Sequence, residues 1–302
     1  MATLAYLNGK FIPESDLGIS VQDAGFVQGV IIAEQLRTFG GELFRIEDHF
    51  QRLKRSLEIV GINGVDQAKL QHAAHELAQE NFQSLDSGDD LNLSIFVTPG
   101  ISIQAATAKE AIPTVGMTTR PLPFSAWSAK YREGQHLAIS KFRQVPETCW
   151  PAELKCRSRM HYYLADRDAQ QKFPGSRALL LDQDGLVAEA STASVLMFNR
   201  SEGIVAPPVD KVLPSVSVAT LRAFANELNV PFSHREITPD ELKKADEVLL
   251  TSTSPCVLPV VSIDTAVIGS GKSGPMFADL IKHWGSAVGV DIIDQANRFQ
   301  RR

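Results

Sequence analysis

The sequence predicts an α+β fold of two domains, in which strands pair as hairpins instead of alternating with helices. Three dipeptides carry this prediction, because Asn8-Gly9, Gly40-Gly41 and Asp184-Gly185 each separate two apolar stretches and favour tight β-turns. A chain of 302 residues is long enough for two domains or one large one. No Gly-x-Gly-x-x-Gly pattern follows a predicted strand, so we do not expect a dinucleotide-binding Rossmann domain.

The first domain is predicted to cover residues 1–120. Its hairpins are followed by a stretch in which Phe50, Leu53, Leu57 and Val60 fall on one helical stripe. The elements expected there are a helix over 46–62, a second helix over 66–82, and strands within 91–100 and 112–124.

Prolines and mixed polarity mark a linker, which we assign to residues 121–135, and the second domain is predicted to cover 136–302. Its expected elements are a strand over 136–140, a helix after Lys155, two strands around Asp184-Gly185, a helix over 216–230, a strand over 247–254 and a closing helix over 274–289.

Composition excludes several classes of protein. The net charge is −5, which argues against binding to nucleic acid or to an anionic membrane. Three cysteines without a Cys-x-x-Cys pair form neither a disulfide framework nor a zinc site. The start lacks a signal-peptide pattern, and no apolar run approaches the ~20 residues of a membrane helix. We therefore expect a cytoplasmic protein. The GSGKSG stretch near Gly269 lacks the first glycine of a P-loop, so we do not expect it to bind a nucleotide phosphate.

Lys155 lies between Leu154 and Cys156, just before the predicted helix. Most lysines are solvated, so a surface lysine is one interpretation. The other is a lysine in a polar cleft, where desolvation and the neighbouring cations Arg157 and Arg159 favour the neutral amine that can attack a carbonyl.

Three stretches could bind an anion. Arg52 and Arg55 share a helix face, Ser217 lies at a helix start after Pro214, and hydroxyls cluster from Thr251 to Ser254 at a strand end. Taken singly, each feature is better explained without a ligand, as a solvated helix face, as ordinary capping and as a common strand end.

Glu189 lies on an otherwise apolar predicted strand, where a half-buried carboxylate needs a partner. That partner is either a nearby arginine or a protonated ring nitrogen of a ligand. An amine nucleophile, a carboxylate for a heterocyclic nitrogen and sites for a phosphate are together what pyridoxal 5'-phosphate requires.

The order of these motifs resembles the class IV, or fold type IV, pyridoxal-phosphate aminotransferases. This family includes the branched-chain and D-amino acid aminotransferases and aminodeoxychorismate lyase. The segments that carry the resemblance are YLNGKFIP, ISVQDAGFVQGVIIAEQLRTFGGELFRIEDHFQRLKRSLEIVGI, the helix after Lys155, DGLVAEASTAS, VLPSVSVATLR and LLTSTSPCVLPV. The resemblance implies a small N-terminal α/β domain, a larger C-terminal domain with a mixed, barrel-like sheet, and a homodimer.

The resemblance also implies roles for single residues. Lys155 would form the Schiff base with the cofactor, and Glu189 would bind the pyridine nitrogen. The phosphate would be held by Arg52 of an HxxRL pattern, by the helix start at Val216 and Ser217, and by Thr253. The substrate would contact Gln28, Arg37 and the backbone of Ser254.

Five positions depart from the family pattern. Gln28 and Ala33 replace residues that usually line the substrate pocket, and Gln35 replaces a glycine of the branched-chain enzymes. Met160 stands five residues after the lysine, where those enzymes have tyrosine, and Ser194 replaces an asparagine. None of these changes removes the cofactor chemistry.

The sequence thus predicts an aminotransferase that moves an amino group between an amino acid and a 2-oxo acid, most similar to the branched-chain enzymes. Two alternatives are a lyase of the aminodeoxychorismate type, echoed by KCRSR around Ser158, and a non-catalytic relative that only binds ligands. Against the lyase, Glu34 and Gln35 replace its threonine pair.

Overall fold

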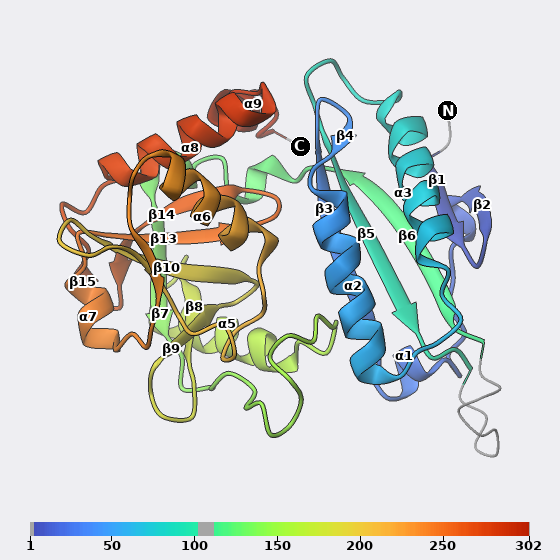
Figure 1. Cartoon of the computed structure of the whole chain (residues 1–302), viewed down its shortest axis with the longest axis horizontal. Helices are drawn as coiled ribbons and strands as arrows, with labels where there is room; N and C mark the ends of the chain where they lie inside the picture. Colours follow the sequence, from blue (N-terminus) through green and yellow to red (C-terminus); the bar gives the residue numbers. More distant parts are fainter. Residues whose placement is uncertain (1–2, 102–111, 302) are drawn as a thin grey trace. The chain divides into compact units, whose positions relative to one another are not determined.

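The structure is a computed structural model that describes residues 3–101 and 112–301. The chain forms two compact units (Figure 1). The first unit comprises Met1–Leu122 and Leu154–Ser158, and the second comprises Pro123–Glu153 and Arg159–Arg302. The chain therefore leaves the first unit, returns to it briefly around Lys155, and then completes the second unit.

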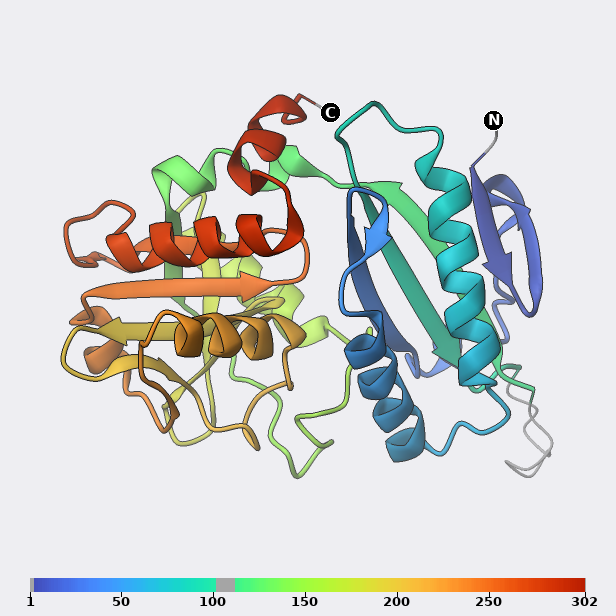
Figure 2. The same ribbon diagram turned by 45° about the horizontal axis from the view of Figure 1, so that its top comes forward.

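The first unit is an antiparallel sheet with the strand order β2-β1-β6-β5-β3-β4. Figure 2 shows α2 and α3 lying side by side against this sheet. Both glycine-containing hairpins are confirmed, since Asn8, Gly9, Gly40 and Gly41 all have the positive φ that such turns need. The elements are β1 Leu4–Leu7, β2 Lys10–Pro13, η1 Glu14–Asp16, α1 Ala24–Val27, β3 Ile32–Phe39, β4 Glu42–Leu43, α2 Ile46–Val60, α3 Gln67–Phe82, β5 Leu91–Thr98 and β6 Thr114–Pro121.

The predicted apolar stripe of α2 forms part of the first unit's core. Phe50, Leu53 and Leu57 are buried and belong to one hydrophobic cluster with residues of α3 and the sheet. The helix ends at Val60 because Gly61 adopts a left-handed conformation with φ 73°. Leu154 also packs against this cluster, which anchors the returning segment to the first unit.

The second unit contains a sheet with the order β12-β11-β10-β13-β14-β7-β8-β9. A further pairing of β9 with β10 closes the strands from β10 to β9 into a barrel, as the resemblance implied. The sheet is mixed, because β7 runs parallel to both β8 and β14. The strands are β7 Gln135–Ile139, β8 Arg177–Leu181, β9 Val187–Ala190, β10 Ala193–Asn199, β11 Gly203–Ala206, β12 Phe232–His234, β13 Glu247–Ser252, β14 Cys256–Ile263 and β15 Ala266–Val267.

Helices surround this barrel. α5 packs against β7 and β8, while α6 and α8 pack against each other and against β13 (Figure 1). The helices of the second unit are η2 Phe124–Ala126, α4 Lys130–Glu133, α5 Met160–Lys172, α6 Val216–Glu227, α7 Pro239–Lys243, α8 Pro275–Val288 and α9 Ile292–Arg298. None of the helices among the described residues has the length and apolar character needed to cross a membrane.

Two sequence-based expectations differ from the structure. The two strands expected around Asp184-Gly185 are three, because Thr192 takes a positive φ of 61° and turns the chain between β9 and β10. The segment 121–135, expected as a linker, carries η2 and α4 and clusters with the second unit from Pro123 onward.

Candidate active site

Lys155 lies in the segment Leu154–Ser158, which runs beside β3 in the first unit. Its carbonyl oxygen accepts a hydrogen bond from Ala33 N at 3.1 Å, and its own N–H donates to Ser56 Oγ at 3.1 Å. Arg157 N donates to Ile31 O at 2.8 Å, as part of the same antiparallel bridge between this segment and the start of β3. The lysine is half-buried, and its backbone is fixed by partners on two elements, so the side chain starts from a defined position.

Glu34, on β3, is the centre of a buried ion cluster in the same unit. Its side chain is 0% exposed and binds both α2 residues of the HxxRL pattern. Arg52 donates from Nη2 to Oε1 at 2.7 Å and from Nε to Oε2 at 2.9 Å, which is a two-pronged ion pair. Oε1 also lies 3.0 Å from His49 Nδ1. The three-residue spacing of His49 and Arg52 places both on one helix face.

The charges in this cluster follow from the pKa shifts. Burial raises the pKa of Glu34, but the charge of Arg52, the His49 hydrogen bond and the charge of Lys155 together hold it well below its usual value. Burial lowers the pKa of His49 more than its contact with Glu34 raises it. The cluster therefore contains an ionised carboxylate, a guanidinium and a neutral imidazole. Ala33, whose N–H donates to Lys155 O, directly precedes Glu34, so the backbone of Lys155 lies beside this cluster.

The predicted substrate residues of the first unit have different surroundings. Arg37 is 1% exposed, with its guanidinium carbon 3.8 Å from the centre of the Phe39 ring and Nη2 3.9 Å from a carboxylate oxygen of Asp90. Gln28 is exposed at the C-terminal end of α1. The structure thus leaves Gln28 accessible and encloses Arg37.

Glu189 lies on β9 of the second unit and is 4% exposed. Its Oε1 accepts a hydrogen bond from Leu213 N at 2.7 Å, and its Oε2 accepts one from the Tyr162 hydroxyl at 2.6 Å. A donor on each oxygen fixes the plane of the carboxylate and favours its ionised form. The buried carboxylate predicted from the strand pattern therefore has specific partners.

The start of α6 has the capping expected from the sequence. Ser215 is the N-cap, and its hydroxyl accepts a hydrogen bond from Val218 N at 3.2 Å. Val216 and Ser217 form the first turn and are buried, at 8% and 5% exposed. The N–H groups of a helix's first turn have no partner within the helix, so this turn can bind an anion.

Thr253 and Ser254 lie in the turn between β13 and β14. Thr253 is half-buried and Ser254 is 9% exposed. The turn is tied at its base, because Thr251 Oγ1 donates to Cys256 O at 2.6 Å and Cys256 has a positive φ of 63°. Hydroxyl and N–H groups are therefore held in a fixed loop at the end of a strand.

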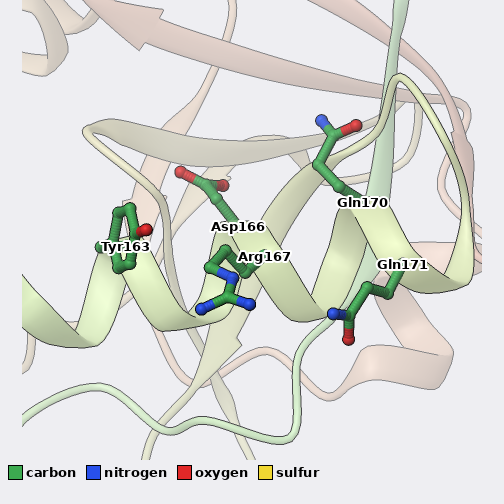
Figure 3. A pocket seen from close by; sticks show the side chains of 5 residues that line it. All are labelled: Tyr163, Asp166, Arg167, Gln170 and Gln171. Atoms are coloured by element: carbon green, nitrogen blue, oxygen red, sulfur yellow. The ribbon is translucent and has the colours of Figure 1, made fainter.

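A hollow of about 410 Å³ lies on the second unit along one side of α5 (Figure 3). It is lined by side chains of that helix alone: Tyr163, Asp166, Arg167, Gln170 and Gln171. It includes none of the residues predicted to bind cofactor or substrate. Nowhere in residues 3–101 and 112–301 do three or more His, Cys, Asp or Glu side chains gather as metal ligands.

The structure adds three side chains that the sequence did not assign to the site. Glu34 and His49 complete the Arg52 cluster, and Tyr162 binds Glu189. The available signal for Glu34 was its place between Ile32 and Leu36, which alternate with it on one face of β3. No local pattern distinguishes Tyr162 from its neighbour Tyr163, because the contact with Glu189 spans 27 residues.

Three comparisons place these features among known proteins. The profile of the family described as amino-transferase class IV matches residues 32–263. A D-alanine aminotransferase from Bacillus licheniformis is 27% identical over 270 residues, which cover 89% of this chain and 91% of the relative.

Solved structures of branched-chain amino acid aminotransferases have the same fold. The Escherichia coli enzyme matches with a TM-score of 0.86 at 18% identity, over 96% of this chain and 94% of that one. The enzyme from Thermoproteus uzoniensis, solved with norvaline, matches with a TM-score of 0.83 at 20% identity, over 96% of each chain. The barrel and the antiparallel sheet described above are thus those of fold type IV enzymes.

Proposed function

The chain belongs to the class IV aminotransferase family, and we propose that it uses pyridoxal 5'-phosphate to transfer an amino group between an amino acid and a 2-oxo acid. The observation that carries the proposal is the backbone of Lys155, which is held by Ser56 on α2 and by Ala33, the residue before Glu34 of the Glu34–Arg52 pair. A lysine and an arginine are thus held by neighbouring elements of one unit, and a cofactor with an aldehyde and a phosphate requires both.

Each unit, taken by itself, supplies donor groups of the kinds that the cofactor needs. Lys155 and Arg52 supply an amine and a guanidinium from the first unit. Glu189 supplies an oriented, buried carboxylate from the second unit, and the first turn of α6 supplies N–H groups. The first turn of α6 suits a dianionic phosphate, and the carboxylate suits a protonated ring nitrogen.

Lys155 is the proposed base. Its nitrogen takes the proton from the α-carbon of the substrate and returns it at a different carbon, so it must be neutral when it acts. The Arg52 guanidinium favours that neutral amine, while Glu34 opposes it. Because Glu34 is already paired with Arg52 through two hydrogen bonds, part of its charge is neutralised within the protein.

Glu189 is the proposed partner of the ring nitrogen. Bound pyridoxal phosphate supplies an electron-withdrawing ring that accepts electrons when the α-proton leaves, and protonation of its nitrogen strengthens this effect. An ionised carboxylate keeps that proton in place. The hydrogen bonds from Leu213 N and Tyr162 keep the carboxylate turned in one direction.

The phosphate is proposed to bind Arg52, the first turn of α6 at Val216 and Ser217, and Thr253. Arg52 is already oriented by Glu34, which lowers the entropic cost of binding a second anion. The Ser215 hydroxyl caps Val218 N, so the preceding N–H groups of the turn are directed along the helix start.

For the substrate, we propose contacts with the accessible Gln28 and with the backbone of Ser254. Arg37 is enclosed by Phe39 and Asp90, so we propose that it supports β3 and acts on the substrate only through that strand. The relative named D-alanine aminotransferase and the branched-chain structures make D-alanine and L-leucine the first donors to test, D-alanine with 2-oxoglutarate as acceptor and L-leucine with 2-oxoglutarate or pyruvate.

We also propose a cytoplasmic homodimer, as the family resemblance implies. Sedimentation velocity of the purified chain would give twice the mass of 33.0 kDa for the dimer. A boundary at the monomer mass over the working concentration range would contradict it.

The test of function is amino-transfer by the wild type, Lys155→Ala and a matched control, Lys69→Ala, whose side chain is 84% exposed on α3. We expect turnover in wild type and K69A and none above background in K155A, with all three folded by circular dichroism. Wild-type turnover retained by K155A would overturn the role of the lysine. Release of pyruvate from aminodeoxychorismate over many turnovers without an acceptor would indicate the lyase instead, and absence of any turnover or cofactor uptake would indicate a non-catalytic relative.

A further inference from the structure

Two adjacent tyrosines on α5 have opposite environments. Tyr163 is 61% exposed and lines the surface hollow of Figure 3. Tyr162 is half-buried and packs against the small cluster of Ala165, Ala169 and Leu180. Neighbouring positions on a helix point about 100° apart, so one tyrosine faces the barrel while the other faces solvent. The inward one reaches Glu189.

The contact between Tyr162 and Glu189 is short and well defined. The hydroxyl lies 2.6 Å from Oε2 of the β9 residue, a distance typical of a hydrogen bond to an ionised oxygen. The other oxygen, Oε1, accepts from Leu213 N at 2.7 Å. A carboxylate offers about four lone-pair sites, so these two donors orient it without exhausting its capacity as an acceptor.

We propose that Tyr162 is a positioning residue of the cofactor site, which holds the Glu189 carboxylate ionised and turned to accept the protonated ring nitrogen of pyridoxal phosphate. This inference rests on the proposed function and assigns it an additional residue. Tyr162 acts through Glu189, so its effect is a change in how that carboxylate receives the cofactor.

The hydroxyl is a donor over the whole working pH range. Burial, and then the charge and hydrogen bond of Glu189, raise the pKa of Tyr162 well above its usual value. The other groups that act on it are Gln144 and Arg159, which both lower the pKa of its hydroxyl, and the charge of Arg177. The His161 ring lies 4.0 Å away between centroids, and burial lowers the pKa of His161 to about 4, so that ring is neutral near pH 7.

A tyrosine that only fills space would be replaced by phenylalanine with little effect on Glu189. A tyrosine that holds the carboxylate ionised has a different consequence. Without its hydrogen bond, the buried carboxylate of Glu189 is less well stabilised as an anion, and protonation at the edge of the working range becomes easier. As the pH is lowered, the variant should then lose its affinity for the cofactor at a higher pH than the wild type does.

The experiment titrates pyridoxal phosphate into the full-length chain, stripped of cofactor by dialysis, and follows cofactor absorbance between pH 5 and pH 9. The variants are Tyr162→Phe, the control Tyr163→Phe, Glu189→Gln and the double variant Y162F/E189Q. We expect Y162F to bind about tenfold more weakly, as loss of one hydrogen bond to a charged group would produce. As the pH is lowered, Y162F should lose its affinity for the cofactor at a higher pH than the wild type does. Y163F should match the wild type.

The double variant decides whether Tyr162 acts through Glu189. We expect Y162F/E189Q to bind no more weakly than E189Q, because the two residues form one unit. Equal affinity and an equal pH profile in Y162F and wild type would overturn the inference while leaving the proposed function intact. Absence of cofactor binding in every protein, wild type included, would overturn the proposed function itself.

Phenylalanine keeps the ring that packs against the alanine cluster, so Y162F should fold, and its thermal unfolding is measured first. If Y162F does not fold, Tyr162→Met replaces it, because methionine fills irregular space without a hydroxyl. The same weakening and the same shift in pH profile are expected. Wild-type binding by Y162M would overturn the inference.

Discussion

Two buried glutamates, one in each unit, are held by different kinds of partner. Glu34 in the first unit is 0% exposed and bonds the cation Arg52 through both of its oxygens. Glu189 in the second unit is 4% exposed and accepts hydrogen bonds from two neutral donors, the Tyr162 hydroxyl and Leu213 N. Residue type and burial are the same, so the partners decide what each carboxylate can do.

An ion pair largely cancels the charge of Glu34 and fixes Arg52, which makes this carboxylate part of the internal framework. The Tyr162 hydroxyl and Leu213 N each bond one oxygen of Glu189 and turn its carboxylate in one direction, which suits it to act on a ligand. The comparison therefore separates a glutamate that orients another protein group from one that receives the cofactor. Four predictions test this difference.

The largest expected effect is on stability, from Glu34→Gln. This change leaves the Arg52 guanidinium buried without its counter-charge, and breaking a buried pair from one side costs roughly 3–5 kcal/mol. The measurement is the free energy of unfolding in urea. Glu58→Gln on helix α2 is the control, because its partners Lys54 and Arg55 are exposed. A change in E34Q no larger than in E58Q would contradict the framework role.

Glu189→Gln should change the affinity for the cofactor much more than it changes the free energy of unfolding. The amide oxygen of glutamine still accepts one hydrogen bond, so we expect unfolding free energy to change by about 1 kcal/mol or less. Affinity for pyridoxal phosphate should fall roughly 100-fold, because the amide cannot keep the ring nitrogen protonated as a charge does. Equilibrium titration measures the affinity. A large loss of stability with normal affinity would reverse the two roles.

The stability difference between wild type and E34Q should depend on pH. The pKa of Glu34 is depressed in the folded state from its usual value of 4.5, so its contribution is complete above that value and is lost as pH falls below it. We expect the difference in unfolding free energy to be constant from pH 6 to pH 8 and to narrow below pH 4.5. A difference that widens in acid would show that Glu34 is not the ionised partner.

The smallest change in the free energy of unfolding is expected from Arg55→Ala, three residues after Arg52. Arg55 lies on the same helix, but its side chain is 55% exposed, and its Nη1 lies 3.9 Å from a carboxylate oxygen of Glu58, which is also exposed. Arg55→Ala should change the free energy of unfolding by less than about 0.5 kcal/mol. It should also leave cofactor affinity at the wild-type value, while Arg52→Ala weakens it. Equal losses in the two variants would remove the distinction between them.

Local patterns in the sequence predicted much of this fold. The hairpins at Asn8-Gly9 and Gly40-Gly41 and the helices α2 and α3 were predicted because turn chemistry and helical periodicity act over a few residues. The third strand of the β8–β10 region was missed, since a positive φ at Thr192 is unusual for a β-branched residue and leaves no sequence signal.

Non-local contacts could not be predicted in the same way. The barrel depends on the pairing of β14 with β7, in which Val260 opposes Gln135, and the return of Leu154–Ser158 to the first unit depends on pairing with β3. The partners of Glu34 and Glu189 are 18 and 27 residues away in sequence. Sequence reasoning therefore identified Glu189 and Lys155 as candidates, whereas Glu34 and the partners of both glutamates required the structure.

The central claim is that Lys155 holds pyridoxal phosphate covalently, and reduction followed by peptide mass mapping tests it most directly. The purified protein is scanned in the visible range, treated with borohydride, digested and analysed by mass spectrometry, with Lys155→Ala treated in parallel. We predict a yellow protein whose cofactor mass becomes fixed to the peptide that contains Lys155. A colourless protein that takes up no added cofactor, or a label fixed at another lysine, would contradict the account.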